Sequence, residues 1–253
     1  MFKFLYIVLF LLFLYAPIAV LVANSFNLSI YGNNWEGFTL RWYESLKYNS
    51  CLLQAAKNSI VIATLSAFLA VVFAVLTAFI IYKYKFPGRT LLFISIQSMI
   101  VFPDIIFAIS LSMLFIVLKA KLGFTTILLS HTALSAPVTS MIIFLGFSKI
   151  EKTILETAKD LGASDLQIFV KIFLPLVSHS IIAAYLIAFT ISFDDVIISS
   201  FVSSPSYDLL PLKIISLARF NMKPEINAIC VIILITSIFL VSSSQFLLRD
   251  KNA

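Results

Sequence analysis

The sequence predicts an all-α protein that crosses a lipid bilayer several times. Hydrophobic residues make up 61% of its 253 residues and charged residues only 12%, whereas soluble domains hold about 45–50% and about 25%. Because about 20 helical apolar residues span a bilayer core of about 30 Å, each long apolar stretch is a candidate span. We expect six transmembrane helices, at residues 4–24, 58–82, 91–118, 124–148, 176–198 and 225–248.

The first two spans and the loop after them set the expected orientation. The stretch 4–24 is longer than the h-region of a signal peptide, which holds about 7–15 residues, so we expect an uncleaved anchor. The segment 25–57 is rich in Trp and Tyr, which suits the headgroup level of a bilayer. The short loop 83–89 contains Lys83, Lys85 and Arg89, as cytoplasmic loops do. With an even number of spans, both termini are then cytoplasmic.

The remaining spans begin where a helix start is favoured. Pro175 opens the fifth span and Pro224 the sixth, because proline lacks the N–H that the first helical turn leaves unpaired. The external segment 199–224 between them contains three prolines, Pro224 included, and is expected to be ordered. No internal repeat accompanies these spans. We therefore expect a single transmembrane domain over residues 1–253.

Composition also excludes several kinds of function. The six glycines are not spaced as G-x-x-x-x-G-K-[ST] or G-x-G-x-x-G, so the chain has no phosphate-binding loop of its own. If ATP is used, another subunit must bind it, and no cofactor or metal is expected on this chain. The net charge of +6 is best explained by cytoplasmic lysines rather than by nucleic-acid binding. Cys51 and Cys230 fall in different segments, and we expect no disulfide between them.

Residues 149–175 form the one long polar interruption on the cytoplasmic side. An apolar stripe at helical spacing predicts a first short helix, formed by Ile154, Leu155, Ala158 and Leu161. Gly162 suits a left-handed stop, and Ser164 with Gln167 suits the capping box of a second helix. The loop is either an interfacial hairpin lying on the membrane or a docking element for a partner subunit.

The spacing of this loop resembles a known motif. Glu156-Thr-Ala-Lys-Asp-Leu-Gly162, nine further residues and then Ile172-Phe-Leu-Pro175 resemble the EAA loop of ATP-binding-cassette (ABC) importer permeases; Thr157 departs from its usual Ala. The resemblance implies the type I permease fold with a cytoplasmic coupling helix that docks on an ATPase. The residues that it assigns to ATPase coupling are Glu156, Ala158, Gly162, Ile172, Leu174 and Pro175.

The similarity extends beyond the loop. Phe102-Pro-Asp-Ile105, Ser192-Phe-Asp-Asp-Val-Ile-Ile-Ser-Ser-Phe201 and Pro205-Ser-Tyr-Asp-Leu-Leu-Pro-Leu-Lys-Ile214 resemble the permeases of spermidine/putrescine importers. The resemblance implies a transporter subunit, not an enzyme, in a bacterial inner membrane. Its implied partners are a second permease of similar fold, two copies of an ATP-binding subunit that uses ATP and Mg, and a periplasmic polyamine-binding protein.

The acids inside the expected spans are candidate substrate ligands. Ionisable groups in hydrocarbon are costly and are usually functional, and Asp104, Asp194 and Asp195 all fall in the outer half of their spans. No Lys or Arg lies within a span to neutralise them. Carboxylates and aromatic faces suit a polycation through charge-assisted hydrogen bonds and cation–π contacts. The expected pathway residues are Asp104, Asp194, Asp195, Ser192, Trp42, Tyr207 and Asp208.

Other readings of these residues stay open at this stage. The acids would alternatively pair with the second permease or end a helix at the interface, and Trp42 would be an interface anchor. His131 and His179 are expected to be hydrogen-bonded packing residues, because neither has a second ligand at helical spacing.

Other function classes also stay open. A membrane enzyme would need an acid with a histidine partner, which no acid has nearby in sequence. An ion-driven secondary transporter fits poorly without an inverted repeat. Within importers, amino acids, iron and other small solutes are alternative substrates.

Overall fold

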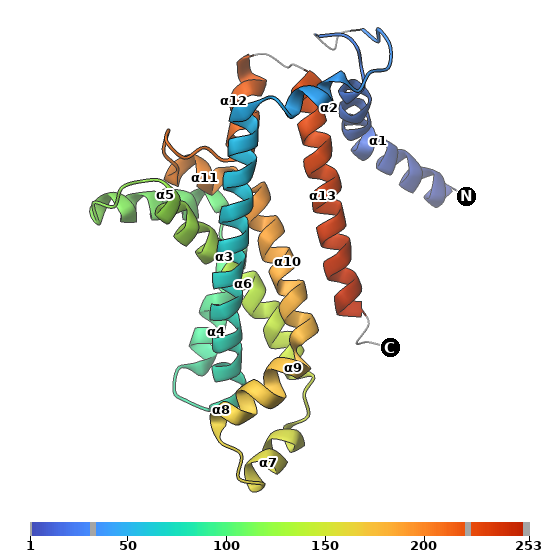
Figure 1. Ribbon diagram of the computed structural model, residues 1–253. Helices are drawn as coiled ribbons and strands as arrows, with labels where there is room; N and C mark the ends of the chain where they lie inside the picture. The colour runs from blue at the N-terminus through green and yellow to red at the C-terminus, as the bar shows by residue number, and fades with distance from the viewer. Residues whose placement is uncertain (1, 31–33, 221–223, 250–253) are drawn as a thin grey trace.

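In the computed structural model, which describes residues 2–30, 34–220 and 224–249, helices make up nearly all of the ordered structure (Figure 1). No β-strand occurs in those ranges; pairing there is limited to two isolated bridges, Asn27 with Phe38 and Ser204 with Tyr207. The expectation of an all-α protein is therefore confirmed.

Three long helices form the centre of the bundle. These are α3 (Ser50–Lys83), α6 (Phe124–Ser148) and α10 (Ser178–Asp194), each of which packs against the other two. Small side chains let the helix axes approach closely, and α3 buries a row of alanines that comprises Ala55, Ala63, Ala67, Ala70, Ala74 and Ala78. The centre is therefore held by close packing between α3, α6 and α10.

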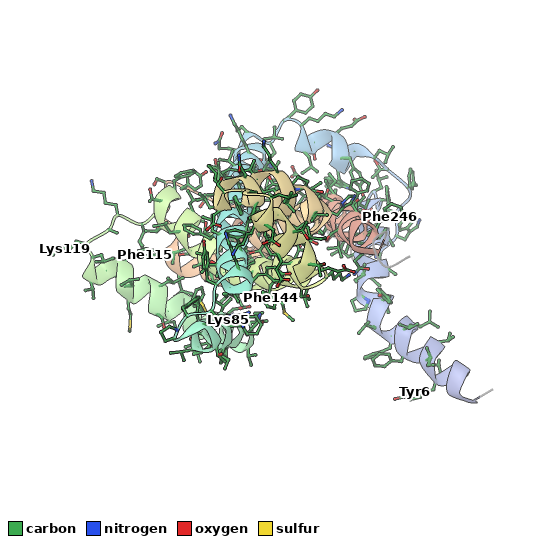
Figure 2. The ribbon with its side chains drawn as sticks, turned by 90° about the horizontal axis from the view of Figure 1, so that it is seen from below. Tyr6, Lys85, Phe115, Lys119, Phe144 and Phe246 are labelled. Carbon is green, nitrogen blue, oxygen red and sulfur yellow. The ribbon has the colours of Figure 1, made fainter. Side chains whose placement is uncertain are left out.

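The first and last helices lie outside this centre. Helix α13 (Pro224–Arg249) packs on α10, and α1 (Phe2–Ser25) packs mainly on α13. Figure 2 shows Tyr6 of α1 far from the bundle, on the side opposite to Lys119. Side chains of α1 are therefore largely exposed, as expected for a helix that faces lipid or another subunit.

Four helices are long and apolar enough to cross a membrane alone, and up to six spans result if each of two bent helix pairs counts as one. The four single helices are α1, α3, α6 and α13. The bent pairs cover Arg89–Val101 with Asp104–Val117, and Asp165–Leu176 with Ser178–Asp194. The six-span pattern expected from sequence thus depends on two broken segments.

The expected third span, 91–118, is broken in the middle rather than one continuous helix, a feature that the sequence did not predict. It consists of α4 (Arg89–Ser98), the 3₁₀ turn η1 (Met99–Val101) and α5 (Asp104–Val117), with a bend of 110° between the two halves. Phe102 and Pro103 separate them in extended conformation. Proline cannot donate its backbone nitrogen to a helix and disfavours the helical region for the residue before it, so the helix ends there.

Within the expected fifth span, 176–198, the continuous helix covers Ser178–Asp194. Helix α10 ends at Asp194, Asp195 is extended, and a short helix α11 (Ile197–Val202) begins in a new direction. Before α10 lie α7 (Lys152–Asp160), α8 (Asp165–Ile168), the π-helical turn η2 (Phe169–Phe173) and α9 (Leu174–Leu176). The two short helices expected in the 149–175 loop are confirmed, with Gly162 at φ +79° between them.

The two ends of the bundle carry different elements. Helices α7 and α8 lie at one end in Figure 1, whereas α2 (Arg41–Leu46) and α12 (Leu210–Phe220) lie at the other. This places the 149–175 loop and the Trp-containing segment on opposite sides of the bundle, as the sequence predicts.

Gly146 permits the close approach of α6 and α10. A Cβ added there would lie 2.5 Å from Ser180 Oγ and 2.9 Å from Ser180 Cβ, both too close for real contacts. We expect Gly146→Val to lower the free energy of unfolding by about 1–3 kcal/mol, as overpacking does, with a lower melting temperature of the purified protein. The added change Ser180→Gly removes the obstructing side chain and should restore much of the loss. Equal melting of parent and Gly146→Val would contradict this packing.

Candidate functional site

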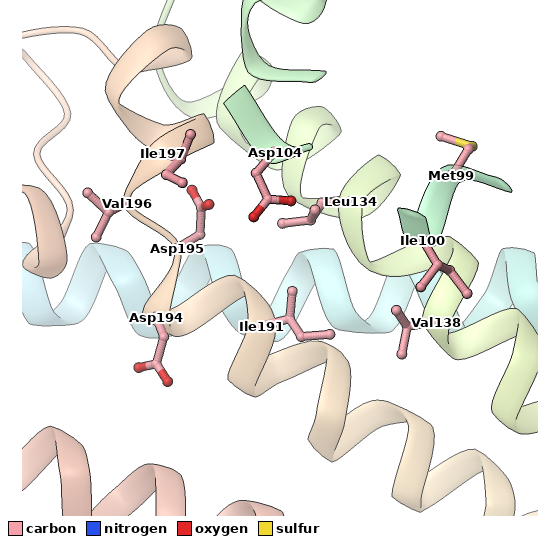
Figure 3. Close-up of a pocket in the computed structure, with 10 residues that line it drawn as sticks. All are labelled: Met99, Ile100, Asp104, Leu134, Val138, Ile191, Asp194, Asp195, Val196 and Ile197. Atoms are coloured by element: carbon pink, nitrogen blue, oxygen red, sulfur yellow. The ribbon is translucent and has the colours of Figure 1, made fainter. Parts of the chain in front are cut away.

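Two helix breaks meet at a cavity of about 460 Å³. One is the Phe102-Pro103 break that starts α5, and the other is the extended link between α10 and α11. The cavity is lined by Met99, Ile100, Asp104, Leu134, Val138, Ile191, Asp194, Asp195, Val196 and Ile197 (Figure 3). The three acids expected to act together are therefore brought to one place, although they are far apart in sequence.

Asp195 is held by the start of α11. Its Oδ2 accepts hydrogen bonds from the backbone N–H and hydroxyl of Ser199 at 2.8 and 2.9 Å. Its Oδ1 accepts a longer bond of 3.3 Å from the Ile198 N–H. An acidic side chain in this position stabilises a helix start, where backbone N–H groups lack partners. Asp195 is therefore partly structural: it stabilises the start of α11, whereas the structural alternative considered from sequence placed it at the end of a helix.

His131 is a partner of Asp195 that sequence spacing did not show. Its Nε2 lies 3.4 Å from Asp195 Oδ2 and 2.9 Å from Ser199 Oγ, and its Nδ1 lies 2.7 Å from Ser192 Oγ. No Lys or Arg lies within a span and no histidine lies near the acids in sequence, but α6 brings His131 to the α10–α11 link and so to Asp195. The interpretation of His131 as a hydrogen-bonded packing residue is confirmed, since its side chain is fully buried.

Asp194 faces the other way. Although it lines the cavity, Figure 3 shows its carboxylate pointing to the side opposite Asp195. Its two oxygens accept hydrogen bonds from Ser237 of α13 at 3.0 and 3.3 Å. Asp194 thus connects the end of α10 to α13. Its carboxylate is less available to the cavity than the carboxylate of Asp195.

Asp104 is the acid with the most available carboxylate. It is the first residue of α5 and is exposed. Within the part of the chain that the structure describes, no side chain or backbone group bonds to its carboxylate. Figure 3 shows it on the same side of the α10–α11 link as Asp195. An unpaired anion beside a buried one is an arrangement that a ligand with two separated positive charges would match.

The aromatic and loop candidates lie elsewhere. Trp42 donates its Nε1–H to the Asn27 carbonyl at 2.7 Å and packs in a separate cluster with Leu46 and Ala228. Its structural position suits the alternative of an anchor in the 25–57 segment. The structure does not bring Trp42 to the cavity that holds the acids.

Tyr207 and Asp208 lie between α11 and α12. Tyr207 packs edge-on against Phe124, with ring centroids 5.6 Å apart. Asp208 pairs with Lys213 at 3.3 Å, and its carbonyl accepts a hydrogen bond from Asn58. Neither residue lines the cavity. Of the acids and aromatic residues expected in the pathway, only Asp104, Asp194 and Asp195 line it.

The coupling residues divide into an inner and an outer set. Ala158 is buried, and Ile172 and Leu174 pack against the same core as Phe173. Glu156, Gly162 and Pro175 are exposed. The expected stripe of α7 is therefore split: Ala158 points inward, whereas Leu161 is 83% exposed. The side chain of Leu155 lies outside the described residues. The exposed outer set is what a partner subunit would contact.

An ion pair fixes this loop to the end of α3. Lys83 pairs with Asp165, and Tyr84 donates its hydroxyl to the same carboxylate at 2.8 Å. The Lys83 side chain is only 3% exposed, and its amine lies 5.2 Å from the centroid of the Phe79 ring. The Lys83 ammonium and the Tyr84 hydroxyl beside it hold the pKa of the Asp165 carboxyl below its ordinary value, so the carboxylate of the pair stays ionised at neutral pH.

The pairing of Lys83 with Asp165 is not evident from the sequence. Lys83 was visible as one of several loop cations and Asp165 as the first residue of a capped helix. Their spacing in the sequence does not predict the contact, because the two residues meet only when the end of α3 and the start of α8 pack together.

The Ser–His–Asp contacts do not favour a membrane hydrolase. Ser192, His131 and Ser199 are at most 4% exposed. Ser199 already donates its proton to Asp195 rather than to His131. A nucleophile needs both a base that accepts its proton and access to substrate. These contacts therefore connect helices and do not form a catalytic site.

Comparison with known proteins agrees with this geometry. The family described as "Binding-protein-dependent transport system inner membrane component" matches residues 70–252. The chain is 43% identical, over 95% of its length and 91% of the relative, to the spermidine/putrescine transport system permease protein PotC of Escherichia coli (strain K12). It is 35% identical, over 88% of its length and 82% of the relative, to the putrescine transport system permease protein PotI of the same strain.

Solved structures show the same fold. A chain of a bacterial ABC transporter involved in the import of the acidic polysaccharide alginate superposes with a TM-score of 0.73 at 17% identity, covering 96% of this chain and 94% of that one. The alginate transporter in complex with its pentasaccharide-bound periplasmic protein gives 0.71 at 16% identity, covering 97% and 91%. These likenesses confirm the expected importer permease fold.

Proposed function

The chain belongs to the family of binding-protein-dependent transport system inner membrane components, and we propose that it forms part of the passage for polyamines in an ATP-driven ABC importer. The observation that carries this proposal is the unpaired Asp104 carboxylate beside Asp195 at the junction of two broken helices. The high identity to permeases of spermidine/putrescine systems over nearly the whole chain supports it. The importer permease fold supports the transport role.

The chemistry of the cavity matches an elongated polycation. A polyamine carries ammonium groups separated by short apolar linkers. The cavity offers carboxylates next to apolar walls of Leu134, Val138 and Ile191. An ammonium in contact with a carboxylate forms charge-assisted hydrogen bonds, while the linkers contact the apolar wall. Broken helices at a substrate site are a recurrent feature of transporters, because freed backbone and polar groups line the passage.

The partners follow from the same proposal. A second permease of similar fold completes the passage, and of the two copies of an ATP-binding subunit one docks on the 149–175 loop. ATP and Mg are used by those subunits. A periplasmic polyamine-binding protein delivers the substrate at the end that carries α2 and α12. The chain then lies in a bacterial inner membrane with both termini cytoplasmic.

A polyamine suits this cavity better than an amino acid does. An amino acid presents a carboxylate as well as an ammonium, and a site for it needs a positive or N–H partner. The residues that line this cavity include three acids and no Lys or Arg. An anionic or zwitterionic substrate would therefore meet uncompensated negative charge, whereas a polycation neutralises it.

The proposal is tested by transport in a reconstituted system. We expect the complete importer in proteoliposomes to take up labelled putrescine or spermidine when ATP is supplied on the cytoplasmic side. The same vesicles should not take up a labelled neutral amino acid. Purified without partners, the chain should not hydrolyse ATP, since it has no phosphate-binding loop. Amino acid uptake without polyamine uptake would contradict the proposed substrate.

A further inference from the structure

A chain of hydrogen bonds runs through the bundle interior from α3 to Asp195. Ser66 Oγ donates to Ser192 Oγ at 2.9 Å, and Ser192 Oγ lies 2.7 Å from His131 Nδ1. His131 Nε2 lies 2.9 Å from Ser199 Oγ, which donates to Asp195 Oδ2 at 2.9 Å. The chain therefore joins α3, α10, α6 and α11, and it ends on a carboxylate that lines the cavity.

The donors in this chain all point toward the carboxylate. Because Ser199 gives its proton to Asp195, its oxygen is left to accept the Nε2–H of His131. Because Ser66 gives its proton to Ser192, the Ser192 hydroxyl is left to donate to Nδ1. These hydroxyl directions leave Nδ1 of His131 to accept and Nε2 to donate. Hydrogen bonds aligned in this way strengthen one another in a low-dielectric interior.

The two carboxylate oxygens of Asp195 differ in the hydrogen bonds that they accept. Oδ2 receives the backbone N–H and hydroxyl of Ser199 and lies 3.4 Å from His131 Nε2. Oδ1 receives only the 3.3 Å bond from Ile198. One oxygen is thus held firmly while the other keeps acceptor capacity, so the carboxylate has a fixed direction from the α10–α11 link into the cavity.

Stability alone does not account for so many buried polar groups. Ser66, His131 and Ser199 are fully buried, and Ser192 is 4% exposed. Apolar groups of similar shape can replace both partners of a buried hydrogen bond with little loss of stability. What apolar residues cannot do is fix the direction of a carboxylate. The polar chain therefore has a use at Asp195 that packing would not supply.

We propose that His131 is a positioning residue for substrate recognition, which acts through Ser199 to hold Asp195 directed at an ammonium group of the substrate. This assignment rests on the proposed polyamine function. His131 itself is buried behind Asp195 and does not touch the substrate. Its removal changes the affinity of the site and leaves the later steps of transport intact.

The test compares three variants of the complete importer. His131→Leu removes both ring hydrogen bonds, and we expect the KM for polyamine uptake to rise about fivefold or more while the maximal rate changes by less than about twofold, since hydrogen bonds to charged groups are affected. His131→Gln keeps an N–H donor and should return the KM toward that of the parent. Thr139→Val is the matched control, because Thr139 is a buried α6 hydroxyl bonded only to carbonyls of its own helix. Its KM should not change.

A double-mutant cycle shows whether His131 acts through Asp195. Adding His131→Leu to Asp195→Asn should give little further rise in KM, whereas adding it to Asp104→Asn should multiply the two losses. Should His131→Leu lower protein abundance, Ser199→Ala breaks the same connection and serves in its place. Independent losses on the Asp195→Asn background, or an unchanged KM in both His131→Leu and Ser199→Ala, overturn the assignment while leaving polyamine import intact. A parent without polyamine uptake overturns the proposed function as well.

Discussion

Replacing Asp104 by Asn should lower polyamine uptake at low substrate concentration about tenfold to a hundredfold. The change keeps the size of the side chain and its place at the start of α5 while it removes the charge. Hydrogen bonds to charged groups contribute about 1.5–3 kcal/mol each, and no other group among the described residues shares this carboxylate. The measurement is the initial rate of labelled polyamine uptake, normalised to the amount of protein in the membrane.

Asp208→Asn is the matched control for this prediction. It deletes the same charge, but Asp208 lies outside the cavity and is already paired with Lys213. Water and salt screen exposed charges of this kind, so uptake should change by less than about twofold. If Asp104→Asn imports polyamine as the parent does, the substrate does not bind at the cavity between the two helix breaks.

Gly162→Pro should detach the coupling loop from its ATPase and abolish most transport. Gly162 has φ +79°, and its N–H donates to the Lys159 carbonyl at 2.8 Å. Proline fixes φ near −65° and has no N–H, a conflict that costs about 3 kcal/mol or more in regular helices. The turn between α7 and α8 cannot then form as observed. We expect the ATP-binding subunit to be lost on purification and uptake to fall at least about tenfold, with normal membrane insertion.

Gly88 provides the comparison that separates local strain from a coupling role. It has φ +90°, and nothing lies within 4 Å of a Cβ at either Gly88 or Gly162. An added methyl therefore meets similar backbone strain and similar space at both positions. Gly162→Ala should weaken retention of the ATP-binding subunit, whereas Gly88→Ala in the 83–89 loop should not. Equal effects of the two changes would contradict the assignment of residues 149–175 to docking.

The broad fold was predictable because it depends on local properties of the chain. Apolar stretches of sufficient length marked the long helices, and Gly162, Ser164 and Gln167 marked the turn between α7 and α8. Pro103 was noted in the sequence, but the apolar residues on both sides of it favoured a single continuous span, so the helix break there was not predicted. Hydropathy measures composition and not direction, so it cannot show a bend of 110°.

The site was predictable only in part, for a different reason. Asp104, Asp194 and Asp195 stood out because charges in apolar stretches are rare. Whether each is free or engaged depends on contacts between distant segments. His131 reaches Asp195 and Ser237 reaches Asp194 only after α6 and α13 have packed. Trp42 stood out by residue type, yet its bond to the Asn27 carbonyl places it in another part of the molecule.

The packing of α1 on α13 has a consequence for biosynthesis. These are the first and last helices of the chain, so α1 enters the bilayer before most of its packing surface has been made. At about 5–20 residues per second, roughly 200 further residues take about 10 s or more to synthesise. During that interval α1 has only lipid or other proteins as neighbours. A nascent chain stalled before α13 would therefore hold its central helices together while its first helix remained unattached in the membrane.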